Sequence, residues 1–375
     1  MLDTTNELNA LKGWIKAQAK ALGFADCGFV HPANPIFSKQ LGALQTWLAQ
    51  GKHGDMLFFE DNHDKRANPA LLVDRTQSII SVRLDYLVTP PPKRSVPDNE
   101  RPNSAIIARY ARGRDYHKTM RGLLKTLARL IQDKLTTDYP QYANDFVFRP
   151  FSDSAPIFER ALAEQAGLGW TGKHTLLIHP QAGSFFVLGE LFTSLPLAED
   201  KKQIETISSH CGSCRACIHV CPTHAIRKTP TGHYDVDARL CISYLTIELD
   251  GKIPVELRPK IGNRIFGCDD CQLICPWNKF AKLATIEDFN PRHRLDEVSL
   301  LELWAWDAQD FLTKTEGSPI RRTGYDNFMR NVAVALGNAP FSQAIIDKLK
   351  QKRPMLSENT QEHIDWAIQQ QLSKS

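Results

Sequence analysis

Residues 211–222 read Cys-Gly-Ser-Cys-Arg-Ala-Cys-Ile-His-Val-Cys-Pro, and residues 268–276 read Cys-Asp-Asp-Cys-Gln-Leu-Ile-Cys-Pro. These two stretches hold seven of the nine cysteines, and an eighth, Cys241, lies between them. The first stretch has the spacing C-x2-C-x2-C-x3-C-P, which is typical of chains that hold two [4Fe–4S] clusters. Two cubane clusters need eight thiolates, so the segment has the number of ligands that a pair of clusters requires.

The same spacing predicts how the ligands divide. In such a run the first three cysteines bind one cluster, and the fourth, before the proline, binds the other. Where a regular second run would place its first cysteine the chain has Ile265, so Cys241 is left to complete that site. The predicted ligands of one cluster are Cys211, Cys214, Cys217 and Cys275, and those of the other are Cys221, Cys241, Cys268 and Cys271.

Zinc is the alternative metal for these cysteines, because pairs of Cys-x2-Cys can build tetrahedral S4 sites. Three thiolates that run into a Cys-Pro with crossed pairing favour iron–sulfur clusters. Structural disulfides are disfavoured, since spacings this tight would strain them. Cys27, outside both stretches, is most simply a small core residue.

The chain has 375 residues, with 42% hydrophobic and 23% charged residues and a formal net charge of +4. This length predicts two or three domains. We see neither a signal peptide nor an apolar stretch of the roughly 18–20 residues that span a bilayer. We therefore expect a cytoplasmic protein with no membrane partner, and a monomer.

Hydrophobic periodicity predicts three regions. Residues 1–197 alternate helical and strand patterns, as in an α/β (α+β) domain with mixed strand order. Expected strands cover 78–87, 104–111 and 146–151, and 175–178 with 184–193 are expected to pair as a hairpin. Residues 198–285 form the ferredoxin-like cluster module. Residues 286–375 are all helical and resemble one or two HEAT-type repeats.

Basic residues gather near the C-terminus. Between residues 314 and 353 there are eight Lys or Arg and three Asp or Glu. Such a patch could follow nucleic-acid phosphates, although a solvated helical face is the simpler explanation from charge alone.

Long motifs outside the cysteine runs point to one family. Residues 110–117 read Tyr-Ala-Arg-Gly-Arg-Asp-Tyr-His, 152–156 read Ser-Asp-Ser-Ala-Pro, and 169–174 read Gly-Trp-Thr-Gly-Lys-His. Further motifs lie at 241–246, 266–272 and 330–338. Over nearly its whole length the chain resembles the epoxyqueuosine reductases, which are similar to reductive dehalogenases in joining a cobalamin-binding domain to two [4Fe–4S] clusters.

The resemblance implies a function. Family members reduce epoxyqueuosine to queuosine at the wobble position of tRNA, the last step of queuosine biosynthesis. The implied cofactors are two [4Fe–4S] clusters and base-off cobalamin. The implied partners are the anticodon loop of queuosine-family tRNA and a low-potential electron donor such as flavodoxin or ferredoxin. A corrinoid reductase of small organohalides and a plain electron carrier are the competing hypotheses.

The resemblance also implies site residues. Asp153 is the expected general acid, with a pKa raised by burial beside the apolar face of the corrin; the local sequence alone favours a cap on a helix that begins near Pro156. Asp269 and Asp270, between two cluster ligands, are expected near both cofactors, unless they simply face solvent. The expected cofactor contacts are Arg66, Asp153, Gly172, Lys173, His174, Leu177, Leu188, Ser243, Asp269 and Asp270. For the stretch 172–174 an ordinary glycine turn is the alternative.

Overall fold

The strand β2 (Ser78–Asp85) is buried along its whole length and organises the first part of the protein. Its apolar residues alternate between two faces, as a strand requires. Ile80, Val82 and Leu84 join one core cluster, and Ile79 joins another on the opposite face. Such a strand needs a covering layer on each side, and the computed structural model, which describes residues 2–91, 101–200 and 210–375, has both layers.

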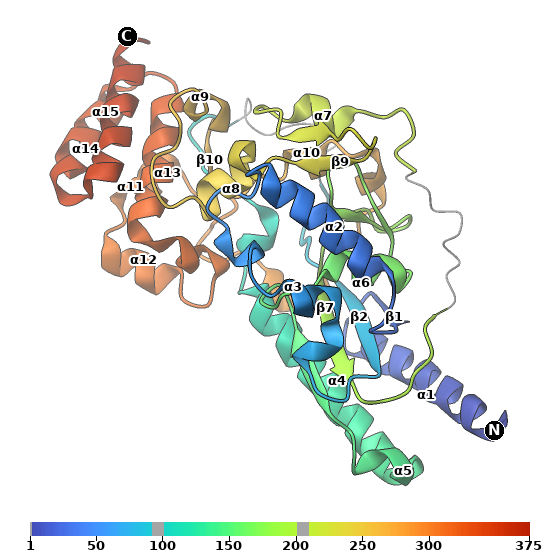
Figure 1. The fold of residues 1–375 in the computed structure, drawn as a ribbon. Coiled ribbons are helices and arrows are strands. Elements are labelled where there is room, and N and C mark those ends of the chain that lie inside the picture. Colours follow the sequence, from blue (N-terminus) through green and yellow to red (C-terminus); the bar gives the residue numbers. More distant parts are fainter. Residues whose placement is uncertain (1, 92–100, 201–209) are drawn as a thin grey trace.

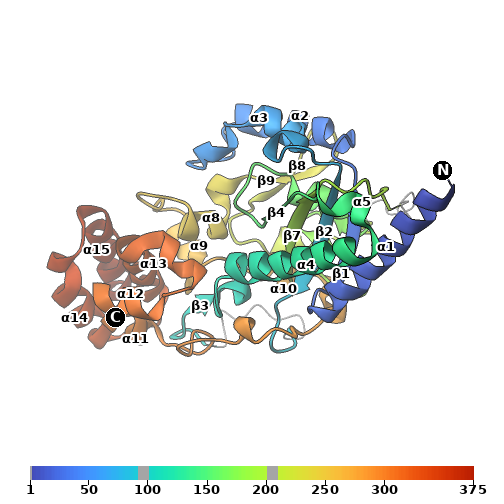
Figure 2. The same cartoon turned by 90° about the horizontal axis from the view of Figure 1, so that it is seen from below.

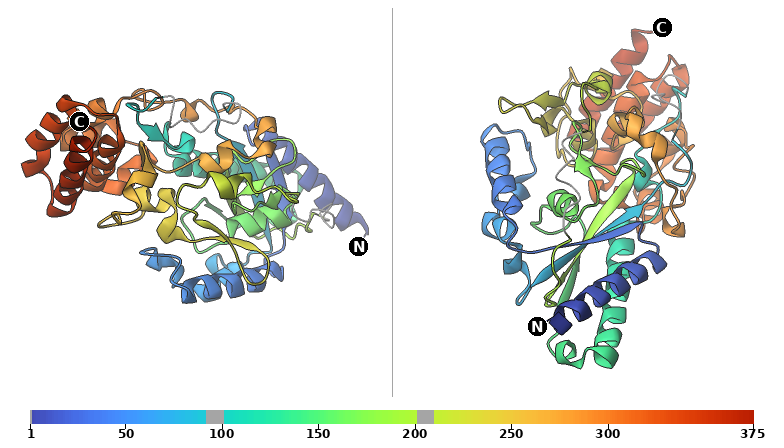
Figure 3. Two further views of the ribbon diagram at one scale, coloured as in Figure 1. Left: turned by 90° about the horizontal axis from the view of Figure 1, so that it is seen from above. Right: turned by 90° about the vertical axis from the view of Figure 1, so that its right-hand side faces the viewer.

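The sheet has the order β1-β2-β7-β4, and every neighbouring pair is antiparallel. The helices α1 and α4 pack on one face, and α6, backed by α2, packs on the other (Figures 2 and 3). The strands of this region are β1 (Asp26–Val30), β2, β3 (Ile106–Ile107), β4 (Phe148–Phe151), β5 (Trp170–Thr171), β6 (Leu177–Ile178) and β7 (Phe186–Thr193). Its helices are α1 (Leu2–Ala21), α2 (Ile36–Ala49), α3 (His63–Ala67), α4 (Tyr116–Asp138), α5 (Pro140–Ala143) and α6 (Glu159–Gln165), with 3₁₀ turns η1 (Leu57–Phe59), η2 (Pro69–Leu72) and η4 (Arg109–Ala111).

Three expectations for this region need correction. The four-stranded sheet is antiparallel throughout, so the region is α+β rather than α/β with mixed strands. The expected strand 104–111 is shortened to Ile106–Ile107, because η4 follows it directly. The expected hairpin is also wrong: β6 pairs with β5, while β7 pairs with β2 and β4.

The cysteine-rich segment consists of short elements. They are α7 (Ala216–Val220), β8 (Ile226–Lys228), β9 (Tyr234–Val236), η6 (Ala238–Leu240), α8 (Ile242–Ile247), α9 (Arg258–Ile261), β10 (Arg264–Phe266), α10 (Asp270–Leu273) and η7 (Pro276–Phe280). The strand β10 pairs in parallel with β3, which ties this segment to the first region. Residues 201–209, near the predicted boundary at 197, lie outside the described residues.

The rest of the chain is helical, as expected. It contains η8 (Glu287–Phe289), α11 (Leu300–Ala305), α12 (Ala308–Lys314), η9 (Pro319–Thr323), α13 (Gly324–Asn338), α14 (Gln343–Lys352), η10 (Arg353–Met355) and α15 (Glu358–Leu372). The helices α11 to α15 form the end of the molecule opposite the N-terminus (Figure 1), whereas η8 packs against α4. None of the helices in the described parts of the chain is long and apolar enough to span a bilayer.

A single hydrophobic core runs across the predicted boundary at residue 285. Ile265 and Phe266 of β10 pack in it together with Trp304 and Val332 of the C-terminal helices. The three predicted ranges therefore share side-chain packing, and their division into 1–197, 198–285 and 286–375 stays a prediction, as does the likeness to HEAT repeats.

Two buried polar residues of α13 join the helical region to the cysteine-rich segment. Arg330 donates hydrogen bonds to the carbonyls of Leu245, Leu249 and Gly251 at 2.6–3.0 Å. The Asn331 amide donates to the carbonyls of Thr246 and Ile265 at 2.8 and 3.0 Å. Both side chains are fully buried, so each bond satisfies a carbonyl that water cannot reach.

We expect Asn331→Leu to lower the free energy of unfolding by about 2 kcal/mol or more, because two buried carbonyls lose their donors. Thermal melting of the purified apoprotein measures the effect. The matched control is Asn327→Leu on the same helix. The side-chain amide of Asn327 donates a hydrogen bond to Asp250 at an exposed position. An equal loss in both variants would contradict the role assigned to Asn331.

Candidate functional site

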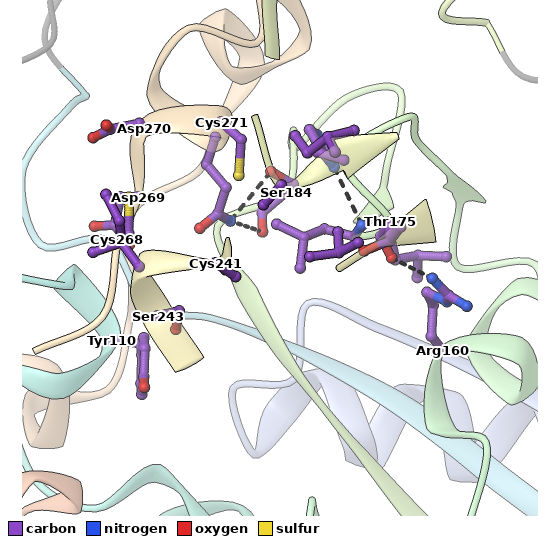
Figure 4. Close-up of a pocket in the computed structure, with 18 of the residues that line it drawn as sticks. Tyr110, Arg160, Thr175, Ser184, Cys241, Ser243, Cys268, Asp269, Asp270 and Cys271 are labelled. Atoms are coloured by element: carbon purple, nitrogen blue, oxygen red, sulfur yellow. Dashed lines mark hydrogen bonds between the residues drawn. The ribbon is translucent and has the colours of Figure 1, made fainter. Parts of the chain in front are cut away.

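A cavity of about 490 Å³ lies between the antiparallel sheet and the cysteine-rich segment. Tyr116 and Asp153 line it from the first region, and Leu177 and Leu188 give it an apolar wall. Figure 4 shows Cys268, Asp269 and Asp270 on one side of the space and Thr175 and Arg160 on the other. The cavity thus brings together residues from opposite halves of the sequence.

The division of the eight cysteines into two ligand groups stays a prediction, but thiols of each expected group lie close enough to influence one another. Burial raises the pKa of Cys217 to about 11, and the neighbouring thiols of Cys275, Cys211 and Cys214 contribute to this rise. Burial also raises the pKa of Cys271 well above its usual value, with contributions from Cys241 and other close neighbours. Thiols held together in this way are poor anions by themselves, and binding to iron would stabilise their deprotonated form.

The two groups differ in their surroundings. Cys221, Cys241, Cys268 and Cys271 all line the cavity. The members of the other group are not part of that lining, and Cys214 among them is exposed. A cluster in the second group would therefore face the cavity, and a cluster in the first would lie nearer the protein surface.

Asp153 lies on a loop with a constrained backbone. Its φ is +57°, in the left-handed region that non-glycine residues seldom adopt. Its N–H donates a hydrogen bond to Glu159, and its Oδ2 accepts one from the Tyr116 hydroxyl. The helix α6 begins at Glu159 after Phe158, so Asp153 does not cap it, and the cap favoured by the local sequence is wrong.

Asp115, His117 and Asp153 form a chain of three polar side chains. Asp115 caps the N-terminus of α4, and its Oδ1 lies 2.6 Å from His117 Nδ1. The other ring nitrogen, Nε2, lies 3.6 Å from Asp153 Oδ2. Burial alone would lower the pKa of His117, but the hydrogen bonds to Asp115 and Asp153 outweigh it and raise that pKa to about 9.

The expected rise in the pKa of Asp153 is not found. Burial acts to raise it, but hydrogen bonds from His117 and Tyr116 have the larger combined effect and lower the pKa below its usual value. In the protein alone at neutral pH, Asp153 is therefore a carboxylate and the proton resides on His117. The expected rise depends on burial beside a corrin face and stays a prediction for the protein with its cofactor bound.

Two further carboxyl groups lie behind Asp153. Glu190 on β7 is fully buried, and its Oε1 accepts a hydrogen bond from Ser81 at 3.4 Å. Burial raises the pKa of both Glu159 and Glu190, and repulsion between neighbouring carboxylates raises it further. Because two adjacent buried carboxylates are costly, this pair retains a proton at neutral pH.

Most of the expected cofactor contacts line the cavity. They are Asp153, His174, Leu177, Leu188, Ser243, Asp269 and Asp270. The suggestion that the two aspartates face solvent is wrong. Asp269 accepts hydrogen bonds from Arg109, and Asp270 forms an ion pair with Arg264 at 2.7 Å. Both side chains are buried.

Three expected contacts lie outside the lining. Arg66 is buried against the rings of Phe59 and Phe158, and its Nε has no hydrogen-bond partner among the described residues. Lys173 donates to the carbonyls of Gly212 and Cys214 at 2.6 and 2.8 Å, so it supports the first cysteine loop. Gly172 starts the turn between β5 and β6. Roles for these three at a cofactor stay predictions.

The sequence reasoning missed several residues that the structure places at the site. Tyr116, His117 and Asp115 were quoted only as part of a family motif, and Glu159 and Glu190 received no role. The spacing Asp-x-His at a helix start is a signal for an N-cap that also orients an imidazole, and it could have identified the first group. The carboxyl pair has no local signal, because β7 and α6 meet only in the fold.

The basic C-terminal patch is smaller in the structure than in the sequence. Arg330 is buried, and Lys352 donates to the carbonyls of Trp304 and Trp306. Arg353 pairs with Asp365. Arg322, about half exposed, pairs with Glu248 and lies close enough to Asp153 to help lower its pKa.

The chain is similar in sequence to two family models and to known proteins. Residues 66–154 match the family model described as "Epoxyqueuosine reductase QueG, DUF1730", and residues 210–278 match the "4Fe-4S double cluster binding domain". The epoxyqueuosine reductase of Pseudomonas aeruginosa is 48% identical over 354 residues, which cover 94% of this chain and 92% of that one. The epoxyqueuosine reductase of Escherichia coli is 47% identical over 371 residues, covering 98% and 91%.

Solved structures agree with these sequence relatives. A crystal structure of selenomethionine-labelled epoxyqueuosine reductase has a TM-score of 0.77 and 26% identity, and covers 97% of this chain and 100% of its own. An epoxyqueuosine reductase with an epoxyqueuosine-modified tyrosine tRNA stem loop has a TM-score of 0.77 and 25% identity, with the same coverage.

We expect Cys241→Ala to lose about half of the iron of the anaerobically reconstituted protein, because one predicted four-cysteine site loses a ligand. Iron and sulfide analysis measures the loss. The matched control is Cys27→Ala, which removes a buried cysteine on β1 away from both groups and is expected to keep full iron content. Full iron content in Cys241→Ala would overturn the ligand assignment.

A second prediction concerns Asp115→Asn. Asparagine keeps the helix cap but removes the charge beside His117, so the pKa of His117 falls from about 9 toward its usual 6.5. Because the pKa of His117 is raised in the folded protein, protonation of His117 stabilises the fold. This contribution is complete below pH 6.5 and is lost as the pH rises through about 9.

Melting temperatures of wild type and Asp115→Asn between pH 6 and 10 test the coupling. The wild type should be more stable at pH 6–7, and the difference should shrink above about pH 9. A difference that does not change with pH would contradict the coupling between the Asp115 charge and His117.

Proposed function

The chain belongs to the epoxyqueuosine reductase family and is an oxidoreductase that acts on tRNA, and from this premise we propose how its cavity works. We propose that it reduces the epoxide of epoxyqueuosine at the tRNA wobble position to the alkene of queuosine. Cobalamin in the cavity would be the catalytic centre, and the double [4Fe–4S] domain would supply its electrons.

One observation carries the proposal: the second cysteine group and Asp153 line the same cavity. Cys221, Cys241, Cys268 and Cys271 would hold a cluster that supplies electrons at the wall of the cavity that Asp153 also lines. Removal of the epoxide oxygen as water takes up two electrons and two protons. The cavity is therefore lined both by the residues that would supply electrons and by the residue that would supply a proton.

The cavity has features that suit a corrinoid. Leu177, Leu188 and Phe186 supply apolar walls for the faces of a large ring. His174 Nδ1 accepts a hydrogen bond from Leu176 N–H, so its Nε2 carries the proton, and this buried donor has no acceptor among the described residues. Burial lowers the pKa of His174 to about 4, so the ring stays neutral and could donate to an amide at the corrin rim.

When bound, cobalamin would supply the low-potential chemistry that opens a strained carbon–oxygen bond. The chain itself supplies position and protons. Because the proton resides on His117 and the Asp153 carboxylate lies between His117 and the cavity, we propose that Asp153 relays a proton to the departing oxygen. Tyr116 holds the Asp153 carboxylate in place through its hydroxyl.

The substrate base must enter from outside. A wobble nucleotide lies in a single-stranded loop and can be splayed into a pocket. We propose that Arg322 and the neighbouring exposed Arg321 on η9 contact backbone phosphates near the entrance. We also propose that the protein works as a cytoplasmic monomer, and that a low-potential carrier such as flavodoxin or ferredoxin reduces it.

Asp153→Asn should retain iron and corrinoid but lose about 10²–10⁴-fold in turnover, because the amide cannot pass on a proton. Single-turnover assays with a modified anticodon stem-loop measure the effect. Ser154→Ala, on the same loop, is the control that should keep activity. Wild-type turnover in Asp153→Asn would remove Asp153 from the reaction.

The overall function is tested in a strain that lacks the gene for this chain. Mass spectrometry of its tRNA nucleosides should find epoxyqueuosine in place of queuosine, and the intact gene should restore queuosine. Normal queuosine in the deletion strain would exclude the proposed activity as the main one.

A further inference from the structure

We propose that the surface around the first cysteine group, formed by the loops at residues 210–215 and 277–283, is the docking site for an acidic protein that carries single electrons. The proposal rests on the proposed function and adds to it the point at which electrons enter. We call this surface the entry face.

The entry face is the place where a cluster comes nearest to solvent. Cys214 is exposed, whereas all four cysteines of the second group are only partly exposed. The second group also opens on the cavity that the substrate must fill. An external carrier can therefore approach the first group without competing with the substrate.

Charge on the two loops is of one sign. The loop at residues 210–215 contains Arg215 but no Asp or Glu, and the loop at residues 277–283 contains Lys279 and Lys282 but no Asp or Glu. These three cations are exposed. Lys282 also lies close enough to Asp85 to influence the pKa of that carboxyl group. A patch of this sign steers acidic partners toward it.

Two exposed apolar side chains lie on the same loop as Lys279 and Lys282. Phe280 and Leu283 are 40% and 48% exposed, large values for such side chains. The ring of Trp277 contacts those of Phe280 and His210, so packed aromatic groups extend from the cysteine loops to the surface. Lys279 lies over the Phe280 ring at 4.6 Å. Apolar centres with polar rims are typical of protein interfaces.

Nucleic acid is the other ligand that a basic surface can attract. The tRNA must deliver its base to the cavity, where Arg322 of η9 lies close to Asp153. The helix α7, which follows Arg215, lies well away from the C-terminal helices α12, α14 and α15 (Figure 1). Two exposed apolar side chains beside a cluster also suit a protein with a buried redox group better than a phosphate backbone.

The electron count is simple. In each encounter the reduced carrier would lose one electron and a cluster held by the first cysteine group would gain it, with no bond made or broken. A cluster held by the second group would accept the electron in turn, and two encounters would supply the two electrons that the epoxide takes up with two protons.

The test uses the reconstituted holoenzyme and two probes, a purified oxidised flavodoxin and a purified acidic 2[4Fe–4S] ferredoxin. Binding is measured anaerobically at low and physiological salt. We expect at least one probe to bind wild type, and Lys279→Glu with Lys282→Glu to weaken that binding about tenfold or more. The matched control is Lys125→Glu with Arg129→Glu on α4, exposed residues at the opposite side of the molecule from α7 (Figure 1), which should bind like wild type.

Two further measurements separate the possible failures. Turnover with dithionite as reductant should be unchanged in all variants, because a small reductant does not need the entry face. Absence of dithionite-driven turnover in wild type would refute the proposed function instead. The inference is overturned if neither probe binds wild type, if Lys279→Glu with Lys282→Glu binds the probes normally, or if that variant loses stem-loop binding and not carrier binding.

Discussion

Eight thiols brought together in a partly buried segment are the constraint on which the rest of this structure depends. Burial and mutual proximity raise the pKa of five of them, so as free thiolates they would repel one another. Iron–sulfur clusters remove this cost by binding the thiolates. The short helices and three-residue strands around them bury too little to be stable alone, and they pack on the sheet region and on the C-terminal helices.

The cavity follows from this arrangement. One cysteine group closes it on the side opposite the sheet, and the Asp153 loop lies along another wall. The loop is held in a left-handed conformation by Glu159 and Tyr116, and its charge is set by His117. Fixed hydrogen bonds of this kind place a proton and its acceptor before the substrate arrives, which is how enzyme sites lower a barrier.

Much of this organisation could be predicted from local sequence. Cysteine spacing predicted a domain for two [4Fe–4S] clusters and long motifs identified the family, and the comparisons confirm both. Helical periodicity predicted α1, α4 and the C-terminal helices, since each buries one face.

Long-range pairing could not be predicted in the same way. The strand β7 pairs with β2 and β4 and so is not available to Leu177–Ile178, which pairs with β5 instead. No local pattern specifies these long-range pairings. The charge state of Asp153 in the protein alone depends on His117 and Tyr116, which lie 36 and 37 residues away in sequence, so the local sequence could not show it. The basic residues of α13 and α14 overstated the surface charge, because Arg330 and Lys352 satisfy buried carbonyls instead.

The most direct test of the central claim is the metal content of anaerobically prepared, reconstituted protein, read together with the electron paramagnetic resonance of its reduced form. Two interacting [4Fe–4S] clusters predict about eight iron atoms per chain and a signal broadened by coupling between neighbouring clusters. Zinc in the cysteine sites, or about four iron atoms with the signal of an isolated cluster, would contradict the account.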